Sequence, residues 1–114
     1  MLKDNIFLKI LDKTIPAKIV YEDDQCLAFR DINPQAPTHV LIIPRKVIPT
    51  HADLTQADIP LIGHMHLVAG KLAKDLGLEK GYRVVINCEE YGGQTVPHLH
   101  MHLLGGRNMT WPPG

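Results

Sequence analysis

GGQTVPHLHMHLL, residues 92–104, is the stretch that determines how this chain folds. From residue 98 onward, polar and apolar residues alternate. Side chains on a strand point to opposite faces in turn, so His98, His100 and His102 are expected to share one face. The apolar residues between them would then pack on a core. The pattern predicts a strand that is anchored by its apolar face and presents three imidazoles on the other.

The loop before this strand has the character of an anion site. Gly92 and Gly93 lack a Cβ, so a ligand can approach their backbone N–H groups closely, and Gln94 and Thr95 follow them directly. Neutral donors of this kind suit oxyanions and are poor metal ligands. An anion site beside three imidazoles indicates phosphate chemistry.

The length and charge of the chain limit its organisation and partners. Its 114 residues are expected to form one domain, residues 1–114, with one core. Lys and Arg together number 12, as do Asp and Glu, so the formal net charge is zero. A neutral chain has no general attraction for polyanions, so neither nucleic acid nor a membrane surface is expected as a partner.

Cysteine usage and hydropathy indicate where the protein works. Cys26 and Cys88 are far apart in sequence and form no Cys-x-x-Cys motif, and the first five residues contain no apolar signal-peptide core. We therefore expect a reduced, cytoplasmic environment. The longest wholly aliphatic run, Val40–Ile43, is far shorter than the ~20 residues that cross a bilayer.

The predicted elements give an α+β fold with a five-stranded antiparallel sheet, one short N-terminal helix and one long central helix. Asp4 is the expected N-cap of the first helix, and a Thr55-x-x-Asp58 capping box begins the second, which Gly77 ends. Apolar periodicity places four further strands at residues 19–21, 26–29, 39–43 and 82–87. Residues 88–95 are expected to form a loop, and residues 22–25 a hairpin turn.

The histidines divide into two groups. We interpret His51, His64 and His66 as ordinary surface or core residues, whereas three rings on one strand face gain little from packing and indicate function. Two chemistries remain open for those three: His-x-His spacing also offers imidazoles to zinc. The adjacent glycine loop favours the phosphoryl interpretation.

Roles in a phosphoryl reaction follow from the spacing. The middle ring, His100, would face phosphorus, since a neutral imidazole nitrogen is a competent nucleophile near pH 7. Its other ring nitrogen would donate to a fixed acceptor such as a backbone carbonyl. His102 would donate to a phosphate oxygen or protonate the leaving group, and Gln94 and Thr95 would add donors. A phosphohistidine intermediate would then be hydrolysed by water.

At this point the sequence resembles a known family. Residues 98–104 match the His-φ-His-φ-His-φ-φ signature of the histidine triad (HIT) family, where φ is apolar. The tail LGGRNMTWPPG, residues 104–114, resembles that of its nucleotide-binding Hint branch. Shorter matches at residues 15–17, 21–24, 29–32, 34–39 and 92–94 extend the resemblance over essentially the whole chain.

The resemblance implies a homodimer of HIT-like α+β protomers that act as purine nucleoside phosphoramidases without metal or other cofactor. Such enzymes cleave the P–N bond of adenosine or guanosine 5′-phosphoramidates to a nucleoside monophosphate and an amine. It implies catalysis by His100, with His98 and His39 as its hydrogen-bonded supports and His102 on the phosphate and leaving group. The implied substrate contacts are Asn87, Gly93, Gln94 and Thr95 at the phosphate, Asp31 at the ribose, and Ile6, Phe7, Ile10, Ile15, Phe29, Ile32 and Leu41 at the purine.

Several of these positions have simpler interpretations. Asp31 also suits an Asx-turn, and the apolar residues of the first helix are equally readable as core. The resemblance implies that the tail with Trp111 reaches the partner's active site.

Three positions depart from the branch pattern. Thr95 stands where serine is frequent, which keeps the hydroxyl, and Pro97 replaces a commonly bulkier residue and removes a strand donor. Arg30 places a cation near the proposed nucleoside pocket and is expected to affect base selectivity or access.

Other functions remain open from the sequence. One is hydrolysis of dinucleoside polyphosphates, as in the fragile-histidine-like branch, although the short chain and the Trp-Pro-Pro-Gly tail are unlike it. Another is a nucleotide-sensing or scaffolding module whose slow catalysis is incidental. The third is the zinc site, which predicts loss of function in chelator.

Overall fold

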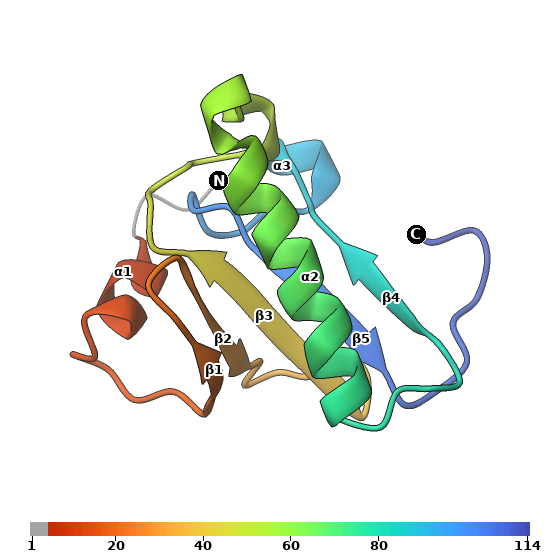
Figure 1. Cartoon of the computed structure of the whole chain (residues 1–114). Helices are drawn as coiled ribbons and strands as arrows, with labels where there is room; N and C mark the ends of the chain where they lie inside the picture. Colours follow the sequence, from red (N-terminus) through yellow and green to blue (C-terminus); the bar gives the residue numbers. More distant parts are fainter. Residues whose placement is uncertain (1–4) are drawn as a thin grey trace.

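The computed structural model describes residues 5–114 and shows a mixed helix and sheet fold (Figure 1). Five strands form one antiparallel sheet in the order β1-β2-β3-β5-β4. This confirms the predicted fold class, with a short helix at the N-terminal end and a long one in the middle of the chain. The elements are α1 (Ile6–Leu11), β1 (Ile19–Glu22), β2 (Cys26–Arg30), β3 (Thr38–Pro44), η1 (His51–Asp53), η2 (Gln56–Asp58), α2 (Ile59–Asp75), β4 (Tyr82–Val85), α3 (Glu89–Gly92) and β5 (Met101–Gly105).

The two faces of the sheet carry separate cores. Helix α2 lies diagonally across one face (Figure 1), where its residues pack on alternate side chains of the strands. On that face the strands contribute Cys26, Ala28, Val40, Ile42, Met101 and Leu103. The intervening side chains, Leu27, Phe29, Leu41 and Ile43, pack with Phe7 and Ile10 of α1 on the other face. The predicted anchoring of the histidine strand by its apolar residues is confirmed, because Met101 and Leu103 are fully buried under α2.

Helix ends follow the local sequence with two corrections. The N-cap of α1 is Asn5, whose side chain accepts from Phe7 N and Leu8 N. Asp4, the predicted cap, lies outside the described residues. The predicted Thr55–Asp58 box forms, but it caps the short η2 helix that leads into α2. Gly77 follows the C-cap of α2 at a φ of 76°, a left-handed conformation that glycine adopts without strain.

The strand of histidines is shorter than predicted. Pairing between β3 and β5 begins at Ile42 and Met101, so His98 and His100 precede the strand. Two prolines explain the difference, because Pro44 ends β3 without an N–H and Pro97 removes a donor just upstream. Residues 88–95 also differ from the predicted loop, since the short helix α3 forms within them.

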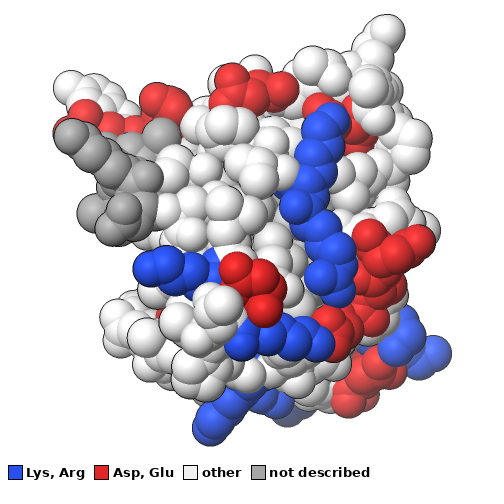
Figure 2. All heavy atoms as spheres, turned by 90° about the vertical axis from the view of Figure 1, so that its left-hand side faces the viewer, with Lys and Arg blue, Asp and Glu red and all other residues white. Residues whose placement is uncertain are grey.

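The surface carries both charges in close proximity. On the face in Figure 2, Lys and Arg side chains lie beside Asp and Glu side chains. Among the described residues, no helix is long and apolar enough to span a membrane.

Candidate active site

A cavity of about 360 Å³ lies between α1 and the sheet, at the end where the histidines gather. The apolar residues that the sequence assigned to a purine slot all line it, together with Asp31, Thr95, His100 and His102. They are Ile6, Phe7, Ile10, Ile15, Phe29, Ile32 and Leu41. Phe7 and Ile10 are buried, while Ile6 is half exposed and Ile32 almost fully exposed. Phe7 and Ile10 are both core and cavity wall, so the two interpretations are compatible for them, whereas Ile6 lines the cavity without belonging to the core.

His100 is held with one ring nitrogen free. Its Nδ1 lies 2.8 Å from the carbonyl oxygen of His98, and since a carbonyl only accepts, Nδ1 must carry the proton. In the neutral ring Nε2 then keeps its lone pair on a residue that lines the cavity. Burial lowers the pKa of His100, against the opposing effects of that hydrogen bond and of Asp31. The ring is therefore neutral at pH 7, as a nucleophile requires.

His102 belongs to a second chain of hydrogen bonds. The backbone N–H of Gln35 donates to His39 Nδ1 at 3.0 Å, so His39 carries its proton on Nε2. That nitrogen lies 2.9 Å from His102 Nδ1 and donates to it. The His102 proton is consequently on Nε2, a buried atom with no partner among the described residues. An unpartnered buried donor beside the cavity is suited to a substrate oxygen or nitrogen.

This arrangement corrects the expected role of His39. The resemblance implied that its ring supports His100, but it is bonded to His102 instead. The reason is register: Leu41 pairs with His102 across β3 and β5, which places His39 and His102 diagonally on one face. Burial lowers the pKa of His39, and burial with the neighbouring His100 and His39 lowers the pKa of His102 to about 4.

His98 is fully buried and supports the site through its backbone and its ring. Its Nε2–H donates to Pro44 O at 2.8 Å, and Asn5 Nδ2 lies 2.8 Å from its Nδ1. Burial lowers the pKa of this ring as well. A ligand in the cavity would have no access to the His98 ring, which contacts His100 through its backbone carbonyl.

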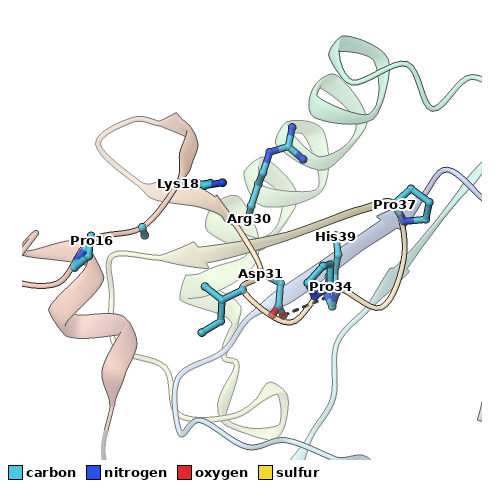
Figure 3. A pocket seen from close by; sticks show the side chains of 9 residues that line it. Pro16, Lys18, Arg30, Asp31, Pro34, Pro37 and His39 are labelled. Carbon is cyan, nitrogen blue, oxygen red and sulfur yellow. Dashed lines mark ion pairs between the residues drawn. The ribbon is translucent and has the colours of Figure 1, made fainter.

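Asp31 combines the two roles that the sequence left open. One carboxylate oxygen accepts from Asn33 N at 2.8 Å and forms the Asx-turn. The other lies 3.5 Å from His39 Nε2, the contact dashed in Figure 3. The carboxylate is thus oriented by the chain while it remains on the cavity wall.

The glycine loop does not present the donors that the sequence predicted. Gly93 N–H and Gln94 N–H donate to Glu90 O and Glu89 O, because they cap α3. The Gln94 amide is also satisfied internally: its oxygen accepts from Glu89 N, and its nitrogen donates to Pro49 O and Val96 O. Gln94 is buried and stabilises this loop through these hydrogen bonds. The prediction that its amide holds phosphate is wrong in this conformation.

Of the remaining predicted contact residues, some line the cavity and others do not. Thr95 is exposed and lines the cavity, and Asn87 is half-buried. Gly93 has a φ of 85°, and a Cβ there would lie 4.0 Å from Asn87 Nδ2, so this glycine serves the turn beside Asn87. Trp111 is 83% exposed in the C-terminal tail and does not line the cavity.

The side chain of Arg30 does not point in the direction that was expected for a cation near the nucleoside pocket. It pairs with Val40, so its side chain shares the face of the sheet that α2 covers. Figure 3 shows its guanidinium pointing away from Asp31, the next residue in the chain. Arg30 is thus among the residues that line the cavity, but its cation is directed away from Asp31.

A second hollow of about 570 Å³ adjoins the first and is shown in Figure 3. The two share Pro16, Ala17, Arg30, Asp31 and Ile32. His39 forms part of its wall, so the two hollows meet at the Asp31–His39 contact. The larger hollow lacks both His100 and His102 and is therefore not where the chemistry would occur.

In the part of the chain that the structure describes, two groups of side chains have the composition of metal sites. Asp31, His39 and His102 bring their donor atoms within 4.8 Å of one another, as do Asp23, Cys26 and His64. In the first group His39 Nε2 carries a proton that it donates to His102, so a metal would have to displace it.

Sequence reasoning missed two residues that this geometry includes. Gln35 fixes the tautomer of His39 through its backbone N–H, and Asn5 bonds to His98. The first has no side-chain signal at all. Asn5 was detectable as a capping residue next to Asp4, but nothing in the sequence links it to a residue 93 positions away.

Fold and site together define a cluster of histidines beside a cavity on an antiparallel sheet, and comparison with known proteins identifies its class. A profile of the HIT domain matches residues 12–109. An uncharacterized HIT-like protein from Synechocystis sp. is 55% identical over 114 residues, all of both chains. The chain belongs to the HIT family.

Solved structures agree. A HIT family hydrolase from Legionella pneumophila is 54% identical and superposes with a TM-score of 0.95, covering 97% of this chain and 100% of that one. A histidine triad nucleotide-binding protein from Candida albicans is 30% identical with a TM-score of 0.81, covering 96% of this chain and 83% of that one.

Proposed function

We propose that this protein is a purine nucleoside phosphoramidase of the Hint branch, which hydrolyses the P–N bond of adenosine or guanosine 5′-phosphoramidates. The observation that carries the proposal is the pair of fixed tautomers at the cavity: a lone pair on His100 Nε2 and a proton on His102 Nε2. A nucleophile and a donor on adjacent rings, 5.0 Å apart between centroids, match the needs of in-line substitution at phosphorus.

The reaction proceeds in two substitutions. His100 Nε2 forms a bond to phosphorus, and the P–N bond breaks with its electron pair on the amine nitrogen, which takes a proton from His102 Nε2. Donation from His39 into His102 Nδ1 stabilises that ring while it gives up its proton. Water then attacks the nucleotidyl-His100 intermediate, returns a proton to His102 and restores His100 with its lone pair.

Binding of the nucleoside is assigned to the apolar half of the cavity. Phe7 and Phe29 meet edge to face with centroids 5.7 Å apart, and the aliphatic wall around them suits a purine ring. The Asp31 carboxylate is placed to accept from the two ribose hydroxyls. Asn87 and Thr95 are assigned to the phosphate, with Gly93 forming the turn beside them.

The same proposal includes a homodimer. Strand β4 is at the edge of the sheet and, within residues 5–114, pairs only with β5, and Tyr82 on it is 45% exposed. Nearby Leu67 on α2 is 76% exposed, and an unpaired edge beside exposed apolar residues favours a second copy as the partner. Analytical ultracentrifugation should give twice the monomer mass of 12.7 kDa.

The test of catalysis is hydrolysis of an adenosine 5′-phosphoramidate that carries a fluorescent amine, in chelator. The wild type should release the amine, and His100→Ala should lower kcat by at least about 10³-fold because the covalent route is lost. His66→Ala, an exposed histidine on α2, is the matched control and should retain full activity.

Denaturing mass spectrometry after a rapid quench should find one added nucleotidyl group on the wild type and none on His100→Ala. Amine release by both proteins at equal rates would refute the covalent proposal. Binding of AMP without any turnover by the wild type would instead favour the nucleotide-binding module. Cleavage of diadenosine polyphosphate in preference to the phosphoramidate would favour the other enzymatic branch.

A further inference from the structure

Asn5 has a double role at the start of α1. Its Oδ1 accepts from the backbone N–H groups of Phe7 and Leu8, at 3.1 and 3.3 Å, and so caps the helix. This orientation leaves the amide nitrogen on the opposite side, where it lies 2.8 Å from His98 Nδ1. Because the cap fixes which end of the amide is oxygen, Asn5 presents a donor to the histidine ring.

The His98 ring accepts that donor only in one state. Its Nε2 donates to the carbonyl of Pro44 at 2.8 Å, so Nε2 carries the proton and Nδ1 keeps a lone pair. Protonation of Nδ1 would set a donor against the Asn5 amide in a fully buried position. Asn5 and Pro44 thus clamp His98 from both sides as a neutral ring with a single tautomer.

This clamp is one step from the nucleophile. The carbonyl of His98 accepts from His100 Nδ1 at 2.8 Å, the bond that directs the His100 lone pair to the cavity. Helix α1 meets the triad a second time through Phe7, whose ring packs edge-on against His98 and His100 with centroids 6.0 and 4.9 Å apart. The helix that forms a wall of the cavity therefore also holds the residue that orients His100.

We propose that Asn5 is a positioning residue for the nucleophile: it fixes the tautomer and place of His98, and through the His98 carbonyl it fixes the orientation of His100. The inference rests on the proposed function, to which it adds a residue outside the histidine motif. It also makes α1 a connection between occupancy of the apolar slot and alignment of His100.

Two substitutions separate positioning from helix capping. Asn5→Asp keeps an oxygen for the cap but replaces the donor facing His98 Nδ1 with an acceptor, which favours a proton on that nitrogen. Asn5→Ser keeps a good cap and removes the donor altogether. Asn108→Asp, an exposed asparagine in the tail, is the control for an added negative charge.

The first readout is the state of the rings, observed as side-chain ¹⁵N chemical shifts of His98 in the NMR spectrum. We expect a neutral Nε2–H ring in the wild type and in Asn108→Asp, and a ring protonated on both nitrogens in Asn5→Asp at pH 7. This measurement needs no substrate, so it tests the clamp even if the wild type lacks phosphoramidase activity. An unchanged His98 ring in Asn5→Asp would overturn the proposal.

The second readout is kinetic. We expect kcat to fall about 10-fold in Asn5→Asp and Asn5→Ser with little change in KM, because misalignment of a reacting group affects the chemical step more than binding. The acid limb of the pH–rate profile should move upward in Asn5→Asp only. If both variants lose melting temperature but keep the wild-type kcat and pH profile, Asn5 is only a helix cap and the proposal fails.

Discussion

The two faces of the sheet use the same strands and yet have different characters. The face under α2 is covered by a helix of 17 residues and is packed with apolar side chains. The other face is covered at one end by α1, which has only six residues. Because the shorter helix leaves part of its face uncovered, the cavity and the histidines are found there.

Alternation along the strands produces this division. In β5, Met101 and Leu103 face α2 while His102 lies beside the cavity, and in β3 Val40 alternates with His39 in the same way. A slip of one residue in register would therefore exchange core for site. Packing of the apolar side chains on one face therefore determines where the histidines lie on the other face.

Among the described residues, each face also holds one carboxylate–histidine pair. Under α2, Asp23 Oδ2 lies 2.6 Å from His64 Nε2, and Tyr21 OH donates to the same oxygen at 2.6 Å. On the open face the corresponding distance, from Asp31 to His39, is 3.5 Å. The first pair ties the β1–β2 turn to α2 and is fully used, whereas the second keeps capacity for a ligand.

The largest effect we predict for the packed face is the loss of Met101. Met101→Ala should lower the free energy of unfolding by about 2–5 kcal/mol, since it opens a cavity in a fully buried site. Urea titration followed by circular dichroism measures this. Activity per folded molecule should remain near that of the wild type. A loss of activity larger than the loss of folded protein would show that the two faces are not separable in this way.

The buried histidines of the open face should make the folded protein less stable as the pH is lowered. The pKa of His102 is lowered to about 4, and burial also lowers those of His39, His98 and His100. Between the unfolded value near 6.5 and these folded values, the unfolded chain binds more protons. Stability should therefore be at its maximum above pH 6.5 and decline as the pH falls towards 4.

Urea midpoints at pH 7.5, 5.5 and 4.5 give this slope for the wild type. His102→Gln should show a shallower decline, because one of the buried rings no longer takes up a proton. Equal slopes for both proteins would mean that the His102 ring is as easily protonated in the folded state as in the unfolded chain.

The sequence predicted which residues are apolar core or cavity wall, but it did not predict contacts between residues that are distant in the chain. Period-two alternation identified the two faces of β5, and the apolar wall residues were found because the family pattern singles them out. The strand start at Met101 was missed because it depends on where β3 ends, at Pro44, two residues beyond Ile42, the residue that pairs with Met101. The internal bonds of Gln94 were missed because polarity alone does not say whether an amide faces a ligand or the chain.

The pair under α2 should have a smaller effect than Met101. His64→Gln removes the bond to Asp23 in a site that is still about a quarter exposed, so a loss of about 1 kcal/mol is expected. The proposed phosphoramidase activity should be unchanged, because the pair is on the opposite face from His100. The measurement is again a urea titration, with His66→Gln as the control for an exposed histidine. A fall in kcat for His64→Gln but not for His66→Gln would connect the two faces.

Substitution of Arg30 should have the smallest effect of those predicted here, and it tests whether neighbouring residues on a strand belong to different faces of the sheet. It adjoins Asp31 in sequence, yet pairing with Val40 turns its side chain to the α2 face. Because its cation points away from Asp31, although the residue lines the cavity, Arg30→Gln should change the Kd for AMP less than about 2-fold. Asp31→Asn should weaken AMP binding about 10-fold or more, because hydrogen bonds to a charged acceptor are each worth about 1.5–3 kcal/mol. Isothermal titration calorimetry on both variants decides the point. An equal loss of AMP affinity in both variants would mean that the Arg30 cation reaches the nucleotide. In that case Arg30 and Asp31 would not be separated on opposite faces at this end of β2.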